Sequence, residues 1–364
     1  MDFRIIDLSL HHINFQMGII DRMSLQKGSA ESYIKRIIDQ SINNKDVRYF
    51  KITSDTTEVI SLINKMINHI KKESINDKEN SDLDSVEEIA ATNEESDIFD
   101  KISYRLCREE KKSQEENKNL KNEIKKGSLI QAMIEIDSKI AYVLAKVEHL
   151  DYLDKNDLEV HTGLPIEKII LKTCIITYDK DFEIEDIKIY DSNSTISKYW
   201  RDGFLDLVEA SSNEDNTLKS FKAIERILSR NIKGKSKADY SLLHNSLLSY
   251  YEQNKNFEYN DLVNKVFKNY TPVEDDVIDI NNIMPKLNDL PKKNNFDAKF
   301  DIINDVIRSK KKRVININSN IDLTIKNSID NLRGMITGIK EPNEEYYIKI
   351  KVDEAVYSNF NFKE

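Results

Sequence analysis

The sequence predicts an α+β protein with N-terminal helices and a small antiparallel sheet, a central helical region and a C-terminal antiparallel β-meander. Three observations favour this class. Apolar residues recur at helical spacing before residue 75 and again after 196, strand-like segments joined by short turns lie between 129 and 190, and alternation at period two returns after 311. The chain has 364 residues, of which 39% are apolar, so its length suggests two domains with sizeable cores.

The N-terminal domain is expected to span 1–190. Its predicted elements are a strand or short helix at 3–8, helices at 29–42 and 54–72, a long polar helix at 101–126, a hairpin at 129–147 that turns at 137–139, and strands at 168–179 and 185–190. In the second helix, Asp55 is placed as the N-cap, Glu58 follows three residues later, and two lysines lie at the negative end of the helix dipole.

The C-terminal domain is expected to span 191–364, beginning at the polar stretch 191–195. Helices are predicted at 197–210, 214–231, 237–254 and 258–269, and strands at 312–318, 321–327, 332–340 and 345–352. Gly234 and Pro272 mark breaks between helices, and short turns with Asn or Gly join the strands. The last four strands therefore predict a terminal antiparallel meander.

Composition narrows the class of protein. No apolar run approaches the roughly 18 residues that a bilayer span needs, and the first residues lack the basic and apolar regions of a secretory signal. We therefore expect a soluble, cytoplasmic protein without membrane contact. Cys107 and Cys174 belong to no CxxC motif and no Cys/His cluster, so we expect buried, inert thiols.

The net charge of −9 comes from one segment. Residues 73–100 hold eleven acids and one base, and the rest of the chain carries +1. Because Phe99 is its only aromatic residue, the segment is typical of a solvated loop, an acidic insertion or a weak helix. Two roles stay open for it: a tolerated surface insertion, or an acidic mimic that competes with phosphates for a basic face.

The helix predicted at 214–231 gives the strongest functional indication. At about 100° per residue, its bases fall within a sector of about 80°, opposite an apolar stripe that includes Phe221 and Ile224. Such a row repels itself unless acids or phosphates lie nearby, and only Glu225 is close in sequence. The row is either a solvated face or a polyanion contact. With the turn that follows it, its candidate DNA-binding residues are Lys219, Lys222, Arg226, Arg230, Lys233, Lys235 and Lys237.

A second basic run, RSKKKR, places five bases within six residues. These further DNA-binding candidates are Arg308, Lys310, Lys311, Lys312 and Arg313. Lysine-rich faces contact the DNA backbone without reading base edges. We therefore expect little sequence specificity.

Catalytic motifs are absent from the sequence. It contains no GxxxxGK[ST], GxGxxG, HExxH or GxSxG pattern. A Mg²⁺-dependent nuclease is the remaining catalytic alternative, since Asp186 with Lys188, or Asp137 with Lys139, matches the short [DE]xK half of its motif. Such triplets are common by chance in a chain this rich in acids and lysines. We expect no catalytic residues, no metal and no cofactor.

The order of four segments, SKYWRDGFLDLVEA, LKSFKAIERIL, SLLHNSLLSYYEQ and YNDLVNKVF, resembles the bacterial nucleoid-associated proteins of the NdpA/YejK type. The tail from FDAKFDI to EEYYIKIKV is similar to the closing segment of that family. The resemblance covers about residues 195–357 and reaches the N-terminal IIDLSLHHIN only weakly. It implies a cytoplasmic, nucleoid-located protein that binds double-stranded DNA without known enzymatic activity. The stretch LDLVEASS, where the family usually has an FLG-like stretch, and the acidic segment depart from the family pattern.

Together these observations predict a nucleoid-associated, largely sequence-independent DNA-binding protein that acts as a homodimer, because pairing doubles a modest cationic patch. The alternative from another class is a protein-interaction adaptor, such as a topoisomerase partner or a component of phage–host conflict. It would use the acidic segment or the edge of the terminal sheet, and the acidic pI near 5.4 favours it.

Overall fold

The computed structural model divides the chain into two compact units, Met1–Ser211 and Ser212–Glu364. It describes residues 2–25, 28–53, 57–79, 93–116, 124–167, 169, 171–193 and 195–362. The polar stretch 191–195 lies inside the first unit, since the segment that follows it still packs on the first core. In these described ranges, no helix is long and apolar enough to cross a bilayer.

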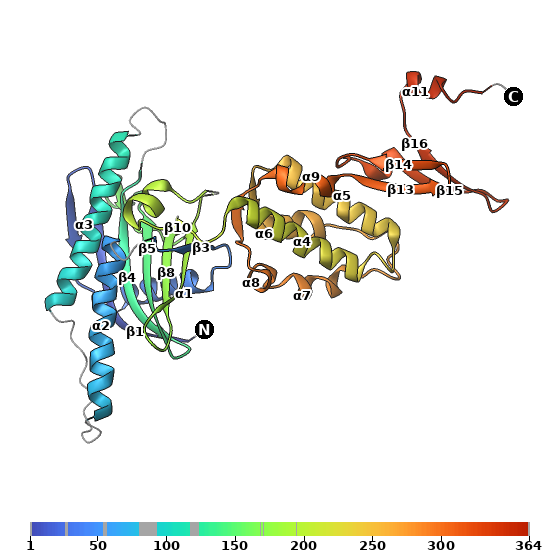
Figure 1. Cartoon of the computed structure of the whole chain (residues 1–364). Coiled ribbons are helices and arrows are strands. Elements are labelled where there is room, and N and C mark those ends of the chain that lie inside the picture. The colour runs from blue at the N-terminus through green and yellow to red at the C-terminus, as the bar shows by residue number, and fades with distance from the viewer. Residues whose placement is uncertain are drawn as a thin grey trace. The chain divides into compact units, whose positions relative to one another are not determined.

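One eight-stranded antiparallel sheet organises the N-terminal unit, in the order β10-β3-β9-β8-β5-β4-β1-β2 (Figure 1). Its strands are β1 (Phe3–Asn14), β2 (Ile19–Arg22), β3 (Arg48–Lys51), β4 (Gly127–Ile136), β5 (Lys139–Glu148), β8 (Leu171–Tyr178), β9 (Ile184–Asp191) and β10 (Val208–Glu209). A separate hairpin joins β6 (Leu150–Leu153) to β7 (Val160–Gly163). The prediction of a small sheet is wrong, because β2, β3 and β10 extend the sheet at its two ends.

The hairpin predicted around residues 137–139 is confirmed as β4 and β5. Asp137 and Ser138 form its turn with φ of 49° and 61°, the left-handed values that a two-residue hairpin turn requires. The strands predicted at 168–179 and 185–190 are confirmed as β8 and β9. Short apolar runs bounded by turns are a local signal, which explains why the sequence predicts these strands.

Helices cover both faces of this sheet. Helix α1 (Ser29–Asn43) packs Ile34, Ile37 and Ile38 against one face, while α2 (Glu58–Glu79) and α3 (Asn93–Glu116) pack against the other. Figure 1 shows α2 and α3 side by side on their face. Burial on both faces explains why the central strands are apolar along their length.

The acidic segment overlaps two helices. Its first residues belong to α2 and its last to α3, whereas 80–92 lies outside the described residues, as does the predicted N-cap Asp55. The polar helix predicted at 101–126 corresponds to α3, which starts earlier, at Asn93, and ends at Glu116. Residues 117–123 lie outside the described residues, and 124–126 are not helical, so the predicted end is wrong. Both cysteines are buried free thiols, as expected from their sequence context.

The helix predicted at 197–210 is wrong in extent. It is a short π-helix, η1 (Tyr199–Phe204), which buries Trp200 and Phe204. Arg105 of α3 donates to the backbone oxygens of Gly203 and Phe204, both at 2.8 Å, and so satisfies the end of η1. The chain then extends, and β10 pairs with β3.

The C-terminal unit has its own core, built mainly by α4 (Asn213–Asn231) and α5 (Lys237–Gln253). Shorter elements complete it: β11 (Asn256–Glu258), α6 (Tyr259–Val263), the π-helix η2 (Asn264–Lys268), the 3₁₀ helix η3 (Ile280–Asn282), α7 (Met284–Leu287), α8 (Leu290–Asn294), β12 (Lys299–Asp301), the 3₁₀ helix η4 (Asn304–Ile307) and α9 (Arg308–Lys311). Phe257 lies at the centre, stacked on Phe300 with ring centroids 4.4 Å apart. The predicted α+β class therefore holds for the chain.

The predicted terminal meander is wrong in its pairing. The last strands form two separate hairpins, β13 (Arg313–Asn318) with β14 (Ile321–Ile325), and β15 (Ile336–Lys340) with β16 (Tyr346–Ile350). The short helix α10 (Leu332–Met335) lies between them, and α11 (Glu354–Ser358) follows. The four predicted strands are found, although the one predicted at 332–340 starts only at Ile336, after α10. Alternation carries no information on which strand pairs with which.

A buried ion pair links α3 to the sheet of the N-terminal unit. Lys146 of β5 contacts Glu110 of α3, and both side chains are fully buried. Lys146 also lies 3.3 Å from the hydroxyl of Tyr199 and 3.2 Å from the backbone oxygen of Lys125. Next to it, Lys172 contacts Glu148 at 3.2 Å and Asp191 at 3.4 Å. Both lysines therefore have carboxylate partners inside the N-terminal unit.

The first prediction concerns this pair. Glu110→Gln leaves the Lys146 ammonium buried without a carboxylate, so we expect the free energy of unfolding to fall by about 3–5 kcal/mol. Glu115→Gln, on the exposed side of the same helix, is the matched control and should change it by less than about 0.5 kcal/mol. Urea unfolding measures both; equal stability of the two variants would contradict the assignment.

Candidate nucleic-acid interface

Helix α4 forms the centre of the candidate interface. Its N-cap Ser212 accepts a hydrogen bond from the backbone NH of Asp215 at 3.1 Å, and Glu214 and Asp215 lie in its first turn, where the helix dipole favours acids. Phe221, Ile224 and Leu228 are fully buried. The apolar stripe fixes which side of α4 faces water.

The opposite side carries the predicted cations. Lys222, Arg226 and Arg230 are exposed, Lys219 is partly exposed, and within the described part of the chain none of them contacts a carboxylate. Lys233, just beyond the helix, lies over the ring of Tyr240 at 5.3 Å. The structure thus places these five residues on one water-facing surface.

Lys235 and Lys237 continue this surface into the start of α5. Both are exposed, and Lys237 occupies the first residue of α5, where the positive end of the helix dipole disfavours a cation. The buried Asp239 holds this turn in place, because its carboxylate accepts hydrogen bonds from Ser236, Tyr270 and two backbone NH groups. We call Lys219, Lys222, Arg226, Arg230, Lys233, Lys235 and Lys237 the α4 cation face.

Three residues of the second predicted set have partners within the protein. Arg308 pairs with Asp305 at 2.8 Å, and Lys311 pairs with Glu252 at 3.3 Å. Arg313 is partly buried and donates to the backbone oxygen of Ser241, and burial lowers the pKa of its guanidinium. Lys311 and Arg313 are therefore less available to a ligand than the RSKKKR pattern suggested, whereas Arg308 stays 80% exposed in its surface pair.

Lys310 lies beside the α4 cation face, and Lys312 is exposed on the chain after α9. The pKa of Glu225 on α4 is lowered by a hydrogen bond with His244 and by the charges of Lys310 and Lys233. Both lysines therefore lie near Glu225. The second set contributes Lys310 to the same region of the C-terminal unit.

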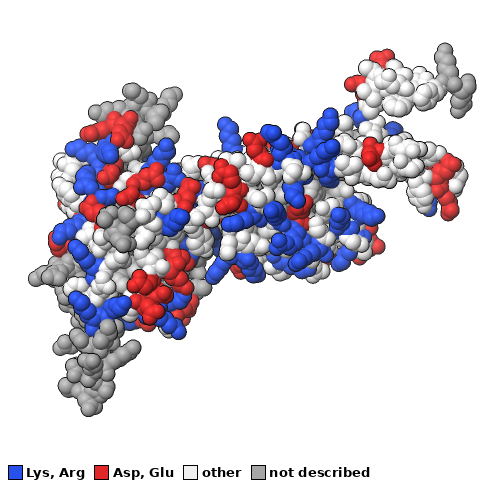
Figure 2. Space-filling view, in the orientation of Figure 1, with Lys and Arg blue, Asp and Glu red and all other residues white. Residues whose placement is uncertain are grey.

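Three further lysines extend the surface on its other side. Helices α7 and α8 pack against α4, and they carry the exposed Lys286, Lys292 and Lys293. Lys286 donates a hydrogen bond to the side chain of Asn231, in the last turn of α4. Figure 2 shows Lys and Arg gathered over this part of the C-terminal unit. The sequence alone does not predict these lysines, because they lie over fifty residues from α4 in segments of weak periodicity.

The two triplets that suggested a nuclease have their lysines paired with carboxylates. Lys188 pairs with Asp186 itself at 3.0 Å, and Lys139 pairs with Glu185 at 2.6 Å. Over the described ranges, no group of three or more His, Cys, Asp or Glu side chains is arranged to hold a metal ion. The lysine that would orient a water is thus engaged with a neighbouring carboxylate in both triplets.

A polar chain in the N-terminal unit was not expected from the sequence. The hydroxyl of Ser128 lies 2.6 Å from Nδ1 of His12 and 2.7 Å from Nε2 of His149. Burial, together with the positive charges around it, lowers the pKa of His149 to about 4. Burial also lowers the pKa of His12. Ser128 is fully buried, so these three hydrogen-bonded side chains are placed to join neighbouring strands and not to bind a ligand.

Comparison with known protein families finds no family model that matches the chain, and no curated protein matches it either. The chemistry of the surface itself therefore carries the argument. A row of exposed ammonium and guanidinium groups without carboxylate partners can bind phosphates, carboxylates or other anions.

The second prediction concerns the pH dependence of stability. His149 is neutral in the folded state down to pH of about 4, whereas an unfolded histidine takes up a proton near about pH 6.5. The unfolded state thus binds more protons in this window, and the free energy of unfolding should fall as the pH drops from about 6.5 to 4. Urea unfolding at several pH values measures this slope.

The matched control is a histidine on an exposed helix position. His149→Gln should flatten the fall in stability, whereas His69→Gln, at an exposed position of α2, should leave it as in the wild type. A His149→Gln curve parallel to that of the wild type would refute the assignment.

Proposed function

We propose that this protein binds double-stranded DNA in the cytoplasm through the α4 cation face, without catalytic activity and with little sequence preference, as a nucleoid-associated protein does. One observation carries the proposal: Lys222, Arg226 and Arg230 are exposed on one side of α4, and none contacts a carboxylate in the described part of the chain. Like charges at this spacing each cost about 0.2–0.5 kcal/mol, which a nearby phosphate would reverse.

The dimensions of the face fit a nucleic-acid backbone. From Lys219 to its end at Asn231, α4 runs for about 18 Å, at about 1.5 Å per residue, and Lys233 lies just beyond this end. Phosphates of one DNA strand recur about every 3.4 Å along the axis, so the row can reach about five of them. Lys286, Lys310 and their neighbours widen the surface on both sides of the row. A linear polyanion matches this shape better than a small anion does.

The side chains involved favour backbone contacts. Lysine is a flexible point charge, and only two of the seven residues in the α4 cation face are arginines, which can bind a guanine edge in bidentate fashion. Phosphate contacts fix the position of a protein on a duplex but carry no sequence information. Binding should therefore tolerate any sequence.

The third prediction is the salt dependence of DNA binding. Contacts to about five phosphates give a slope near −4.5 in log affinity against log salt concentration. Lys222/Arg226/Arg230→Ala should make this slope less steep by about 2.7, because three contacts are lost. Titration of a labelled duplex at three salt concentrations measures it.

A variant with the same change in net charge controls for long-range electrostatics. Lys65/Lys111/Lys112→Ala removes three exposed lysines from α2 and α3 of the N-terminal unit and should keep the wild-type slope. An unchanged slope in the α4 variant would show that another face binds. If no complex forms at low salt, and a pull-down of partner proteins survives nuclease treatment, the adaptor function replaces this proposal.

A further inference from the structure

The last hairpin of the chain exposes apolar side chains that a soluble surface normally covers. Tyr346, Ile348 and Ile350 alternate along one face of β16 and are 75%, 48% and 40% exposed. Figure 1 shows this hairpin at the end of the C-terminal unit, away from helices α7 and α8. Three consecutive outward positions on one strand form a continuous patch.

The edge of β16 is also free. The β15–β16 sheet has two strands, and among the described residues β16 pairs with β15 alone. Its outer NH and CO groups are thus available to another strand. A two-stranded hairpin is only marginally stable by itself in water, so further pairing is favourable.

The exposed apolar area on and after β16 is of the size that interfaces bury. Tyr346 and Tyr347 of β16, and the aromatic residues after it, are half to four-fifths exposed; the latter are Tyr357, Phe360 and Phe362. Together their exposed surface equals that of about three full aromatic side chains, roughly 500–800 Å². Stable complexes bury about 800 Å² on each partner. The neighbouring isoleucines supply the remainder.

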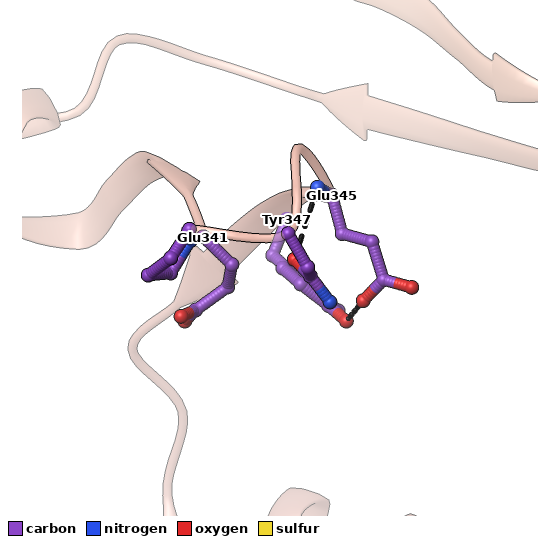
Figure 3. Close-up of a pocket in the computed structure, with 5 residues that line it drawn as sticks. Glu341, Glu345 and Tyr347 are labelled. Atoms are coloured by element: carbon purple, nitrogen blue, oxygen red, sulfur yellow. Dashed lines mark hydrogen bonds between the residues drawn. The ribbon is translucent and has the colours of Figure 1, made fainter.

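Charge is divided between the two ends of β16. Glu344 and Glu345 precede the strand at the turn, while Lys349 and Lys351 lie at its other end. Figure 3 shows Glu345 at the turn, hydrogen-bonded to the hydroxyl of Tyr347. That bond lowers the pKa of Glu345, so its carboxylate is ionised at neutral pH. An antiparallel copy of the same hairpin would place acids opposite lysines.

We propose that β16 pairs antiparallel with β16 of a second copy of this chain, about a two-fold axis at Ile348. In this register Ile348 faces itself, Tyr346 faces Ile350, and Glu345 faces Lys351 of the partner subunit. One face of the extended sheet is then apolar across both chains, and the other pairs Glu345 with Lys351 and Tyr347 with Lys349. The interface is isologous, as a two-fold dimer requires.

Neighbouring registers are less favourable. An axis at Lys349 places that lysine opposite itself, and an axis at Ile350 places Lys349 opposite Lys351. An axis at Tyr347 places Ile350 opposite Glu344, which sets an apolar side chain against a charge. The axis at Ile348 is the one that matches both faces.

Sedimentation equilibrium of the full chain without DNA tests this interface independently of the proposed function. The wild type should be a dimer at micromolar concentration. Glu345→Lys and Lys351→Glu should each weaken the dimer about tenfold or more, because each dimer contains the pair twice. An equimolar mixture of the two variants should restore wild-type affinity, since all cross-strand pairs are then again opposite in charge.

Glu341→Lys is the matched control, because Glu341 lies at the turn outside the paired strand, and it should dimerise like the wild type. Circular dichroism checks that all variants are folded. A monomeric wild type up to high micromolar concentration would overturn the proposal. So would single variants that dimerise normally, or a mixture that stays monomeric.

Discussion

Helix α4 holds like charges beside one another in water, and the proposed function depends on this arrangement. The helix is stable because Phe221, Ile224 and Leu228 are buried in the second core, not because its surface is electrostatically favourable. The same burial orients Lys222, Arg226 and Arg230 outward. Burial of these apolar side chains therefore holds the cations in a row, and an anionic ligand would reduce the repulsion between them.

The two units differ in charge. The N-terminal unit carries 30 bases against 41 acids, whereas the C-terminal unit carries 25 against 23. The acidic pI of the chain is thus a property of its first part, above all of segment 73–100. Because exposed charges are screened over about 10 Å at ordinary ionic strength, the local balance near α4 governs anion binding more than the net charge does.

Local patterns predicted the elements, but contacts between distant residues decided the assembly. Helix 29–42 and the hairpin at 137–139 follow from periodicity and turn chemistry, and both were found within a residue. Strand β10 exists because Val208 pairs with Lys51, which no local pattern reveals. Similarly, the row on α4 follows from helical spacing, whereas the pairing of Lys311 with Glu252 joins residues that are far apart in the sequence. The addition of Lys286 depends on how α7 packs, which is also non-local.

The two units also differ in whether their cations are buried and paired. In the N-terminal unit, Lys146 pairs with Glu110 of α3 and Lys172 pairs with Glu148 and Asp191 of the sheet, so both charges are buried away from any ligand. In the C-terminal unit, the α4 cation face lies at the surface without such partners in the described residues. A count of lysines does not distinguish these cases, although their chemistry is opposite. Burial and pairing, rather than abundance, therefore identify the surface that can attract a polyanion.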